Sequence, residues 1–481
     1  MSYGETLNYL YNLQKHGIKF GLDNISRLIS ALDNPHKAFP SVHVAGTNGK
    51  GSTSAIIASV LKAAGLKVGL FTSPHVVSFT ERIRVNGEEM TEDDVIKLAE
   101  EIKSIVEHLG DFSPTFFEVV TAMALLYFKR EKIDIAVIEV GMGGRLDATN
   151  IVIPEVSVIT NISCDHKEFL GNTLKEIAHE KAGIIKREVP VVTSYQESEV
   201  IEVIEKKAAE KEAELYAYGR DFSSALKRED ISGICFDYLG SDSFTIHDLI
   251  LPLTGEHQMQ NASVAIKAAM IVLNSLRISK SPTHEEMFVS LCDTRGNENN
   301  PPSPPFSKGG LGGFSEENIA EVIRNGCATT RWPGRLEMIK EEPPMIIDGA
   351  HNPAAAMTLS RALKKIFLRK YKKIIMVLGI MGDKDVRGIM EPLLPLASEI
   401  ILTSPAYSRA ASPDKLVDVA ASLGFFDIWI APTVKDAIEM ATDLALGTFY
   451  SSLIVITGSF YTIGEAKEAI GQKGVLANLR E

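Results

Sequence analysis

Short apolar runs of strand length alternate along this chain with longer segments whose apolar residues recur at helical spacing. The first clear pair begins at residues 41–45, where polar and apolar side chains alternate as in a β-strand. A helix ending at Gly65 is predicted next, from apolar residues three or four positions apart: Ala55, Ile56, Ile57, Ala58, Val60, Leu61 and Ala64. A short glycine-rich turn therefore joins a strand to the start of a helix.

This alternation continues to about residue 276. Residues 3–32 predict two short helices around a glycine-bounded connector at 17–23. Further strands are predicted at 67–72, 133–139 and 156–160, and in an α/β extension at 190–193, 215–218, 234–238 and 243–253. Helices are predicted from Thr91, over about 115–129, from Thr173, and from Gln258 to about Leu276.

The pattern restarts near residue 344. Each predicted strand is followed by a helical segment, and the strands fall near 344–348, 373–379, 398–403, 427–430 and 453–457. This spacing is typical of a parallel sheet with helical crossovers. We therefore expect an α/β fold with two domains, a larger one over 1–292 and a smaller, Rossmann-like α/β domain over 326–481. An insertion and linker at 293–325 would separate them.

The segment 293–315 differs in kind from the rest of the chain. Proline and glycine dominate it, and few of its residues could be buried in a core. We expect a disordered insertion without a catalytic role. A proline-rich docking site is the less favoured alternative.

Composition narrows the class of protein. The chain has 481 residues, of which 45% are hydrophobic and 23% charged, as in ordinary soluble proteins. A net charge of −12 argues against a general nucleic-acid or membrane binder, although it leaves room for an anionic ligand. The four cysteines have no metal-binding or disulfide spacing, and neither a signal peptide nor an apolar run of membrane-spanning length is present. We expect a cytoplasmic protein.

The turn after the first strand carries the strongest chemical signal: Thr47-Asn48-Gly49-Lys50-Gly51-Ser52. Glycines let the backbone approach a phosphate closely, and the N-terminus of the following helix attracts negative charge. Lys50 can reach terminal phosphates, and Ser52 can offer its hydroxyl to Mg²⁺. Val44 and Gly51 depart from the general phosphate-loop pattern, so an ordinary glycine turn is the alternative. The flanking strand and helix favour a P-loop-type ATP-binding domain.

Polar side chains follow other predicted strands of this domain. Ser73 and His75 follow the strand at 67–72, and Glu139 ends the strand at 133–139. Ligands of open α/β sheets bind beyond the carboxyl ends of the strands, so these side chains lie where chemistry is expected. Glu139 is a natural Mg²⁺ ligand beside a phosphate loop. A capping or ion-paired glutamate is the alternative.

Two further side chains are ambiguous when taken alone. His166 follows the strand at 156–160 and is either a metal ligand or, as is more common for a single histidine, a structural hydrogen-bonding group. Lys181 lies within a predicted helix, where a solvated charge is the usual interpretation. The glycines at 141–144 lack the spacing of a dinucleotide fingerprint, so NAD binding is not indicated.

The combination of motifs is far more specific than any one of them. It consists of Gly46-Thr-Asn-Gly-Lys-Gly-Ser52, Thr72-Ser-Pro-His75, Glu139-Val-Gly-Met-Gly-Gly-Arg-Leu-Asp-Ala-Thr-Asn150, Asp165-His166, Glu180-Lys-Ala-Gly183, Asn261, Trp332-Pro-Gly-Arg335, Asp348-Gly-Ala-His-Asn-Pro353 and Asp383-Lys-Asp385. In this order they resemble the Mur ligase superfamily, and within it folylpolyglutamate synthase/dihydrofolate synthase. The family's own phosphate loop has the departures seen at Val44 and Gly51. The resemblance makes 1–292 an ATP-binding domain of the Mur-ligase central type and 326–481 a glutamate-ligase domain.

The resemblance implies roles for polar residues of both domains. ATP would be bound by Thr47, Asn48, Gly49, Lys50, Gly51, Ser52 and Asn261, with Arg335 and Asp348 reaching it from across the domain interface. Two Mg²⁺ sites would be formed by Ser52, Ser73, Glu139, His166 and Lys181. In the family the lysine that matches Lys181 is carbamylated by CO₂, which turns a cation into a carboxylate-like ligand. Lys50 and Lys181 are thus expected to be catalytic, with His351 and Lys384 contributing from the second domain.

The resemblance also implies where the pterin binds. The matching positions are Phe20, Gly21, Leu22, Asp23, Thr115, Phe117, Leu146, Asp147 and Ala148. The loop near residue 20 is then functional and not a plain connector. Family members that only extend folates often differ at the histidine of Ser-Pro-His and in the Arg-Leu-Asp-Ala segment. This chain has His75 and Arg145-Leu146-Asp147-Ala148, as bifunctional members do, so we expect both activities.

The reaction implied is amide formation driven by ATP. A carboxylate is a poor electrophile, so the acid (dihydropteroate or the γ-carboxylate of a folate) would attack the γ-phosphate to form an acyl phosphate. The amine of L-glutamate would then displace phosphate. The first step brings anions together and needs positive charge from Lys50, the loop N–H groups and Mg²⁺. Closure of the two domains would keep water from the acyl phosphate.

Two other functions remain as alternatives. A Mur ligase acting on a nucleotide-linked cell-wall precursor would carry an additional N-terminal domain, and here the phosphate loop begins only about 45 residues into the chain. An ATP-driven switch needs one Mg²⁺ site, whereas Ser73, Glu139, His166 and Lys181 suggest two. We expect small-molecule partners, no nucleic acid and no membrane. Family membership suggests a monomer.

Overall fold

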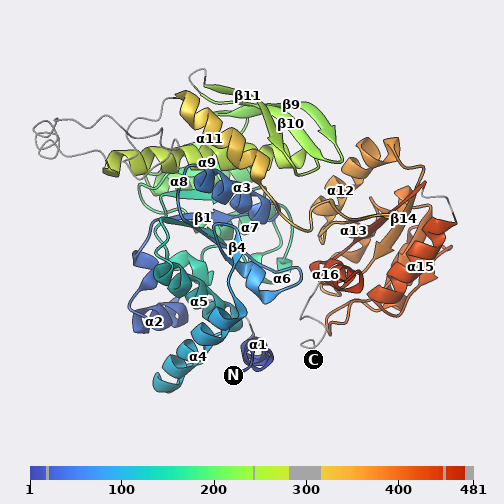
Figure 1. Ribbon diagram of the computed structural model, residues 1–481, viewed down its shortest axis with the longest axis horizontal. Coiled ribbons are helices and arrows are strands. Elements are labelled where there is room, and N and C mark those ends of the chain that lie inside the picture. Colours follow the sequence, from blue (N-terminus) through green and yellow to red (C-terminus); the bar gives the residue numbers. More distant parts are fainter. Residues whose placement is uncertain (18–20, 242–243, 281–315, 448–450, 472–481) are drawn as a thin grey trace, which may run out of the picture.

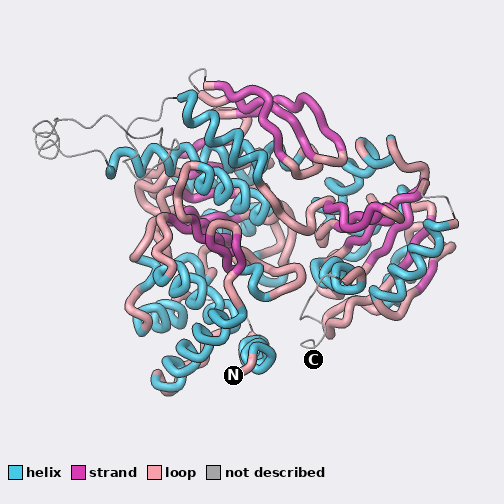
Figure 2. Tube along the Cα trace, viewed as in Figure 1, coloured by secondary structure: helices cyan, strands magenta, loops and turns pink. Residues whose placement is uncertain are grey.

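The computed structural model describes residues 1–17, 21–241, 244–280, 316–447 and 451–471. These residues form two α/β domains that lie side by side (Figure 1). The first domain contains an eight-stranded and a three-stranded sheet, and the second a six-stranded sheet (Figure 2). The expected α/β fold of two domains with mostly parallel sheets is confirmed.

The eight-stranded sheet has the strand order β4-β3-β2-β5-β1-β6-β7-β8. All strands from β2 to β8 in this order are parallel, and β3 and β4 add an antiparallel edge. The strands are β1 (Ser41–Ala45), β2 (Val68–Phe71), β3 (Ile83–Val85), β4 (Glu88–Glu89), β5 (Ile135–Glu139), β6 (Val156–Ile159), β7 (Val191–Thr193) and β8 (Leu215–Ala217). Every predicted strand of this sheet is present within a few residues.

Helices cover both faces of this sheet because its central strands are apolar on both sides. In β5, Ile135 and Val137 pack toward α3, α9 and α11, whereas Ala136 and Ile138 pack toward α1, α2, α4 and α5. Helices α7 and α8 cover the remainder of the second face. The helices are α1 (Tyr3–Asn12), α2 (Asp23–Ala31), α3 (Lys50–Ala63), α4 (Glu92–His108), α5 (Phe116–Arg130), α6 (Lys167–Leu170), α7 (Leu174–Ala182), α8 (Ser198–Glu210), α9 (His257–Lys280) and α11 (Glu316–Thr329).

A three-stranded antiparallel sheet lies on the same side as α9. It consists of β9 (Ser223–Asp230), β10 (Gly233–Leu239) and β11 (Thr245–Leu251). Phe236, Ile246 and Leu249 are buried in the core that includes α9. Strand β9 was not predicted, because no residue of it is fully buried and its sequence therefore lacks an apolar pattern.

The second domain is built on the strand order β12-β13-β17-β14-β15-β16, in which β12 alone is antiparallel to its neighbour. The charged edge strand β12 was not predicted. The strands are β12 (Glu337–Glu341), β13 (Pro344–Ile347), β14 (Lys373–Leu378), β15 (Glu399–Leu402), β16 (Trp429–Ile430) and β17 (Ser452–Thr457). Its helices are α12 (Pro353–Lys365), α13 (Val386–Met390), α14 (Pro413–Ser422), α15 (Val434–Leu446) and α16 (Phe460–Ala469).

The predicted domain boundaries require a correction. Helix α11 occupies residues that we assigned to the linker at 293–325 and to the start of the second domain at 326. It packs on α3, where Ser59 Oγ donates to Gly326 O at 2.7 Å. The first domain therefore includes α11, and the second begins after Thr329. The predicted insertion at 293–315 lies outside the described residues.

Among the helices that the structure describes, none combines the length and the apolar character needed to span a lipid bilayer.

Candidate active site between the two domains

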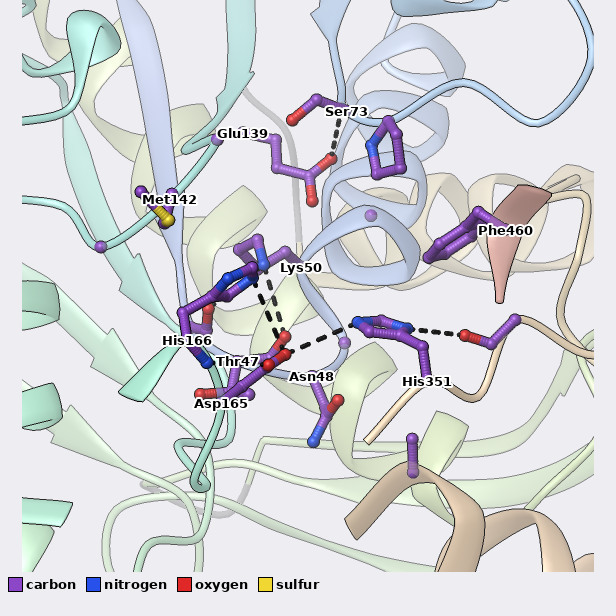
Figure 3. A pocket seen from close by; sticks show the side chains of 18 of the residues that line it. Thr47, Asn48, Lys50, Ser73, Glu139, Met142, Asp165, His166, His351 and Phe460 are labelled. Atoms are coloured by element: carbon purple, nitrogen blue, oxygen red, sulfur yellow. Dashed lines mark hydrogen bonds and ion pairs between the residues drawn. The ribbon is translucent and has the colours of Figure 1, made fainter. Parts of the chain in front are cut away.

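A cleft of about 1100 Å³ lies between the domains. Its walls are the segments that follow β1, β2, β5 and β6 of the first sheet and β13, β14 and β17 of the second. Figure 3 shows the cleft from close by, with His351 and Phe460 facing the phosphate-loop residues Thr47, Asn48 and Lys50. Carboxyl ends of parallel strands from both sheets thus converge on one site.

Most of the predicted site residues line this cleft. From the phosphate loop, metal and ATP sets they are Thr47, Asn48, Gly49, Lys50, Gly51, Ser52, Ser73, Glu139, His166, Lys181, Asn261, Arg335 and Asp348. From the substrate set they are Gly21, Thr115, Phe117, Leu146, Asp147 and Ala148, and from the second domain His351 and Lys384. The structure therefore brings together residues that are up to 363 positions apart in sequence.

The phosphate loop has the backbone geometry that its glycines allow. Gly49 precedes α3 with a φ of +87°, and a Cβ there would lie 2.4 Å from Asn261 Oδ1. The first turn of α3 directs N–H groups without helical partners toward the cleft. Lys50 Nζ folds back and donates to Gly46 O at 3.2 Å and to Thr47 O at 3.3 Å. This loop can cradle a polyphosphate.

Glu139 is a buried carboxylate at the cleft wall. Its side chain accepts a hydrogen bond from Ser73 N at 3.2 Å (Figure 3). Burial raises the pKa of Glu139 to about 7, although Lys50, Ser73 N, Arg335 and Arg82 act in the opposite direction. Because burial disfavours the charged form of this carboxylate, a bound cation would stabilise it. With the hydroxyls of Ser52 and Ser73 it offers the oxygen ligands that Mg²⁺ prefers.

The described residues contain no cluster of three or more His, Cys, Asp or Glu side chains suited to a metal ion. A site formed by Glu139 and the two serine hydroxyls would therefore leave several coordination positions for phosphate oxygens and water. This is how Mg²⁺ is usually bound beside nucleotides. The residues present fit a nucleotide-bound Mg²⁺ better than a metal held by protein alone.

Lys181 is buried in α7 without a carboxylate partner among the residues described. Its Nζ donates to Gly46 O at 2.8 Å. Burial, and then the charge of Lys50, lower the pKa of Lys181 to about 7. Burial also lowers the pKa of His166 to about 4, helped by Lys384, Lys50 and Lys181 and opposed by Asp165. A partly neutral amine can react with CO₂ and a neutral imidazole can bind metal, so both groups fit the expected second metal site.

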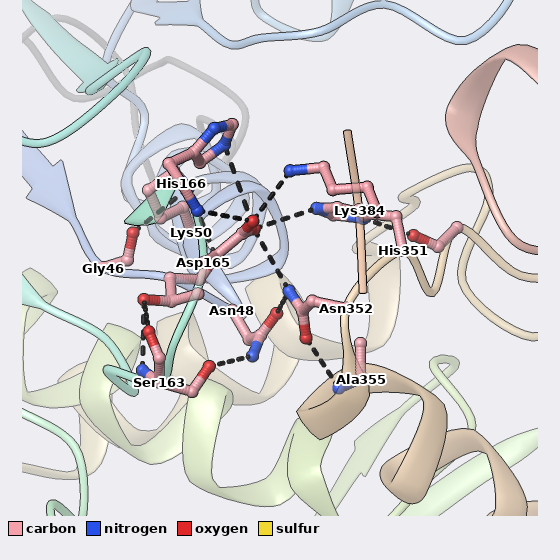
Figure 4. A network of polar contacts seen from close by, with 12 residues as sticks. Gly46, Asn48, Lys50, Ser163, Asp165, His166, His351, Asn352, Ala355 and Lys384 are labelled. Carbon is pink, nitrogen blue, oxygen red and sulfur yellow. Dashed lines mark hydrogen bonds and ion pairs between the residues drawn. The ribbon is translucent and has the colours of Figure 1, made fainter. Parts of the chain in front are cut away.

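Asp165 joins the two domains (Figure 4). Its carboxylate lies 2.7 Å from Lys384 Nζ, 3.6 Å from His351 Nε2 and 3.4 Å from Asn352 Nδ2, all in the second domain. Asn352 Nδ2 also donates to Asn48 Oδ1 of the phosphate loop at 3.0 Å. Although burial alone would raise it, the pKa of Asp165 is held well below its usual range by His351, His166 and Lys384. The phosphate loop and the second domain are thus directly connected.

The half-buried Arg335 and the buried Asp348 line the cleft from the second domain. Asp348 accepts hydrogen bonds from Leu336 N and Ala350 N, each at 3.0 Å. Burial raises the pKa of Asp348 and lowers that of Arg335, and each opposes the shift of the other. The Arg335 guanidinium lies 4.8 Å from the ring centre of Phe460. The polar groups of Arg335 and Asp348 and the aromatic ring of Phe460 are therefore available to contact a ligand at the domain interface.

Phe116 and Phe117 line the cleft, and each packs on a further aromatic side chain. Tyr11 stacks on Phe116 with 5.5 Å between ring centres, and Phe117 stacks on Phe71 at 5.9 Å. Phe117 also fills the space beside Gly141, where a Cβ would lie 2.4 Å from its ring. Such flat apolar walls suit a fused aromatic ligand.

Three predicted substrate residues, Leu22, Asp23 and His75, are not found in the cleft wall. Phe20 lies outside the described residues. Leu22 packs on the core beneath α1 and α2, and Asp23 is exposed in the first turn of α2. His75 stands behind the wall, where its Nδ1 accepts a hydrogen bond from Arg82 Nε at 2.8 Å. The expected direct substrate contacts of Leu22, Asp23 and His75 are therefore not supported.

Comparison with known proteins agrees with this geometry. A family model described as the Mur ligase middle domain matches residues 44–269, and one described as the Mur ligase glutamate ligase domain matches 334–460. A folylpolyglutamate synthase of Lacticaseibacillus casei is 32% identical over 98% of this chain and 99% of its own length. This chain belongs to the folylpolyglutamate synthase/dihydrofolate synthase family of Mur ligases.

Other members of the folylpolyglutamate synthase family match over similar lengths. The dihydrofolate synthase/folylpolyglutamate synthase of Bacillus subtilis is 32% identical over 98% of this chain and 99% of its own. A folylpolyglutamate synthase structure from Mycobacterium tuberculosis with ADP and AMPPCP has a TM-score of 0.83 at 30% identity, covering 98% of this chain and all of that one. An FPGS–AMPPCP–folate complex has a TM-score of 0.78 at 31% identity, with the same coverage.

Several residues that line the cleft of this folylpolyglutamate synthase family member were not predicted from its sequence. Phe116 and Arg82 were not singled out, and neither were Tyr407 and Tyr461, which stack at 4.3 Å on the second-domain side. An aromatic or basic residue in an amphipathic segment looks the same whether it faces a core, solvent or a ligand. Asp165 was not assigned a role either, although its place in the Asp165-His166 motif was a sequence signal that could have identified it.

Proposed function

We propose that this chain is an ATP-dependent ligase that joins L-glutamate to tetrahydrofolate and also to dihydropteroate. The observation that carries this proposal is the single cleft in which a phosphate loop, Glu139 and Lys181 face His351 and Lys384 of the glutamate-ligase domain. Two relatives that match this chain over 99% of their own length support it. One is named folylpolyglutamate synthase and the other dihydrofolate synthase/folylpolyglutamate synthase. The proposal that both acids are used rests on the Arg145-Leu146-Asp147-Ala148 segment and His75.

The chemistry follows from the charges of the cleft. The acid carboxylate attacks the γ-phosphorus of ATP, the bond to the β–γ bridging oxygen breaks, and ADP and an acyl phosphate result. Lys50 and the N–H groups at the start of α3 offset the negative charge that this step brings together. The amine of L-glutamate then attacks the acyl carbon and expels phosphate. His351 and Lys384, on the second-domain wall of the cleft, are proposed to contribute charge stabilisation.

Mg²⁺ would be held by Ser52, Ser73 and Glu139, and a second ion by His166 and Lys181 after carbamylation. When bound, these ions neutralise phosphate charge and orient oxygens. Arg335 and Asp348 are proposed to contact the nucleotide from the second domain, together with Asn261. The Asp165 contacts would hold the domains closed over the acyl phosphate, so that the amine and not water reaches it.

We further propose that the protein acts as a monomer in the cytoplasm. A monomer is supported by the cleft, because residues of one chain supply both of its walls. The cytoplasm is supported by Cys164, Cys235 and Cys327, which are free thiols, as is usual in a reducing compartment.

The test is release of ADP by the purified protein with Mg²⁺, ATP and L-glutamate, with dihydropteroate and tetrahydrofolate added separately and a control without either. We expect turnover with both acids and a product one glutamate heavier by mass spectrometry. Turnover with tetrahydrofolate alone would exclude the dihydrofolate synthase activity. ADP release that ignores both acids and glutamate would favour an ATP-driven switch.

A further inference from the structure

Arg82 is a buried arginine in the cleft wall that forms no ion pair with a carboxylate among the described residues. It is 8% exposed and lines the cleft together with Ser73, Thr115 and Glu139. Its carbonyl oxygen accepts from Thr72 N at 2.9 Å, which fixes its backbone beside the end of β2. Within the described chain, its two terminal nitrogens make no hydrogen bond or ion pair with protein. A guanidinium with unused donors therefore faces the cleft.

Neutral groups hold this guanidinium in place. Arg82 Nε donates to His75 Nδ1 at 2.8 Å, and His75 Nε2 lies 3.4 Å from the Tyr11 hydroxyl. Since Nδ1 accepts, the ring proton of a neutral His75 is on Nε2. The guanidinium lies 5.4 Å from the ring centre of Phe116. These contacts fix its direction without neutralising its charge.

A buried charge is costly unless an anion compensates it. Glu81 and Glu139 are within electrostatic range of Arg82, but Glu81 accepts hydrogen bonds from the backbone N–H groups of residues 76–78 and Glu139 accepts one from Ser73 N. Arg82 contacts the ring of Phe116 and is also an electrostatic neighbour of Glu139, on which Lys50 of the phosphate loop acts as well. An anion bound to Arg82 would therefore connect the aromatic residues of the cleft with its phosphate-binding residues.

We propose that Arg82 binds the reacting carboxylate of the acid substrate through its two terminal nitrogens. The planar fork of N–H donors matches a carboxylate in geometry and charge. His75 and Tyr11 are then positioning residues, which explains how His75 can matter for the acid without lining the cleft. This inference rests on the proposed function, because it takes the substrate to be a pterin-linked carboxylic acid.

The test compares acids with their uncharged amides. Binding of dihydropteroate and of its carboxamide is measured by calorimetry without ATP, so that no turnover occurs, and the same is done for tetrahydrofolate and its γ-carboxamide. Wild type, Arg82→Gln and Arg82→Lys are compared, with Arg84→Gln as the control. Arg84 lies two residues further along the chain and is paired with Glu89 at 3.1 Å.

We expect wild type and Arg84→Gln to bind the acids about 10- to 100-fold more tightly than the amides, in the range of a charged hydrogen bond. In Arg82→Gln this preference should be lost while amide binding is unchanged, and Arg82→Lys should restore part of it. Nucleotide binding and the thermal unfolding midpoint identify any variant that fails to fold. An acid preference that survives in both Arg82 variants would overturn the inference. If wild type binds neither pterin acid, the proposed function fails instead.

Discussion

At the scale of single residues, burial sets the chemistry of two lysines in one stretch of chain. Lys181 is buried against Gly46 O, and burial lowers its pKa to about 7. Lys186 is half-buried against Asn150 O, and burial lowers its pKa to about 8. An ordinary lysine has about one amine in a thousand neutral at pH 7.5. Both lysines are therefore more reactive than usual, but only Lys181 faces the cleft.

We predict that CO₂ adds to Lys181 and not to Lys186. Addition needs the neutral amine, and the product is an anion that Lys50 would stabilise, since the charge of Lys50 acts directly on Lys181. Carbon-13 NMR with labelled bicarbonate and Mg²⁺ should show one carbamate signal in wild type and in Lys186→Met. The signal should be absent in Lys181→Met.

The same shift has a consequence for stability without CO₂. Between pH about 7 and 10.5 the unfolded chain holds a proton on Lys181 that the folded chain has released. Stability contributed at this position therefore rises with pH across that window, and Lys181→Met should flatten the rise. A carbamate signal that persists in Lys181→Met would contradict the assignment of the carbamate to Lys181, independently of how the free energy of unfolding depends on pH.

At the scale of elements, both ends of α3 are marked by glycines with the same backbone conformation. Gly49 has a φ of +87° and Gly65 one of +86°. A Cβ at Gly49 would lie 2.4 Å from Asn261 Oδ1, whereas nothing lies within 4 Å of a Cβ at Gly65. The two positions therefore separate the cost of the backbone conformation from the need for space in the phosphate loop.

We predict that Gly49→Ala and Gly65→Ala each cost roughly 1 to 2 kcal/mol of stability, because an alanine is strained at positive φ. Gly49→Ala should also weaken binding of a non-hydrolysable ATP analogue by ~10-fold or more, since the loop must move away from Asn261. Gly65→Ala should leave this affinity unchanged. Calorimetric titration and thermal unfolding measure the two effects. Equal nucleotide affinities in the two variants would mean that the loop adapts without loss.

The elements also show what the sequence could and could not predict. Strands such as β5 are apolar on both faces, so their burial can be predicted from their sequence alone. Strands β9 and β12 are polar edge strands defined by backbone pairing to a neighbour, and α11 was hidden because it follows the proline-rich segment. Arg82 was missed for a related reason. Its role depends on what lies opposite in space, and no local pattern carries that.

At the scale of the whole molecule, two sets of ion pairs connect the domains. In the cleft, Lys384 and Asp165 have side chains only 11% and 8% exposed. Nearer the surface, Lys365 of α12 has 45% of its side chain exposed and pairs at 3.0 Å with Glu256, which is 59% exposed, and at 2.9 Å with Glu229, which is 4% exposed. Breaking a buried pair costs about 3 to 5 kcal/mol, whereas an exposed pair contributes about 0 to 1 kcal/mol. The cleft pair should therefore dominate the closed arrangement.

We predict that Lys384→Met opens the ligand-free molecule, because it removes the ammonium group that pairs with the buried Asp165 carboxylate and leaves the weaker contacts with His351, Asn352 and His166. Small-angle scattering should show a larger radius of gyration than in wild type. Asp165→Asn should open it less, since an amide can still accept from Lys384. Glu256→Gln, which removes the charge of the exposed pair with Lys365, should scatter as wild type does. If Glu256→Gln opens the molecule and Lys384→Met does not, the surface pair holds the domains together, and Asp165 serves the local order of the phosphate loop instead.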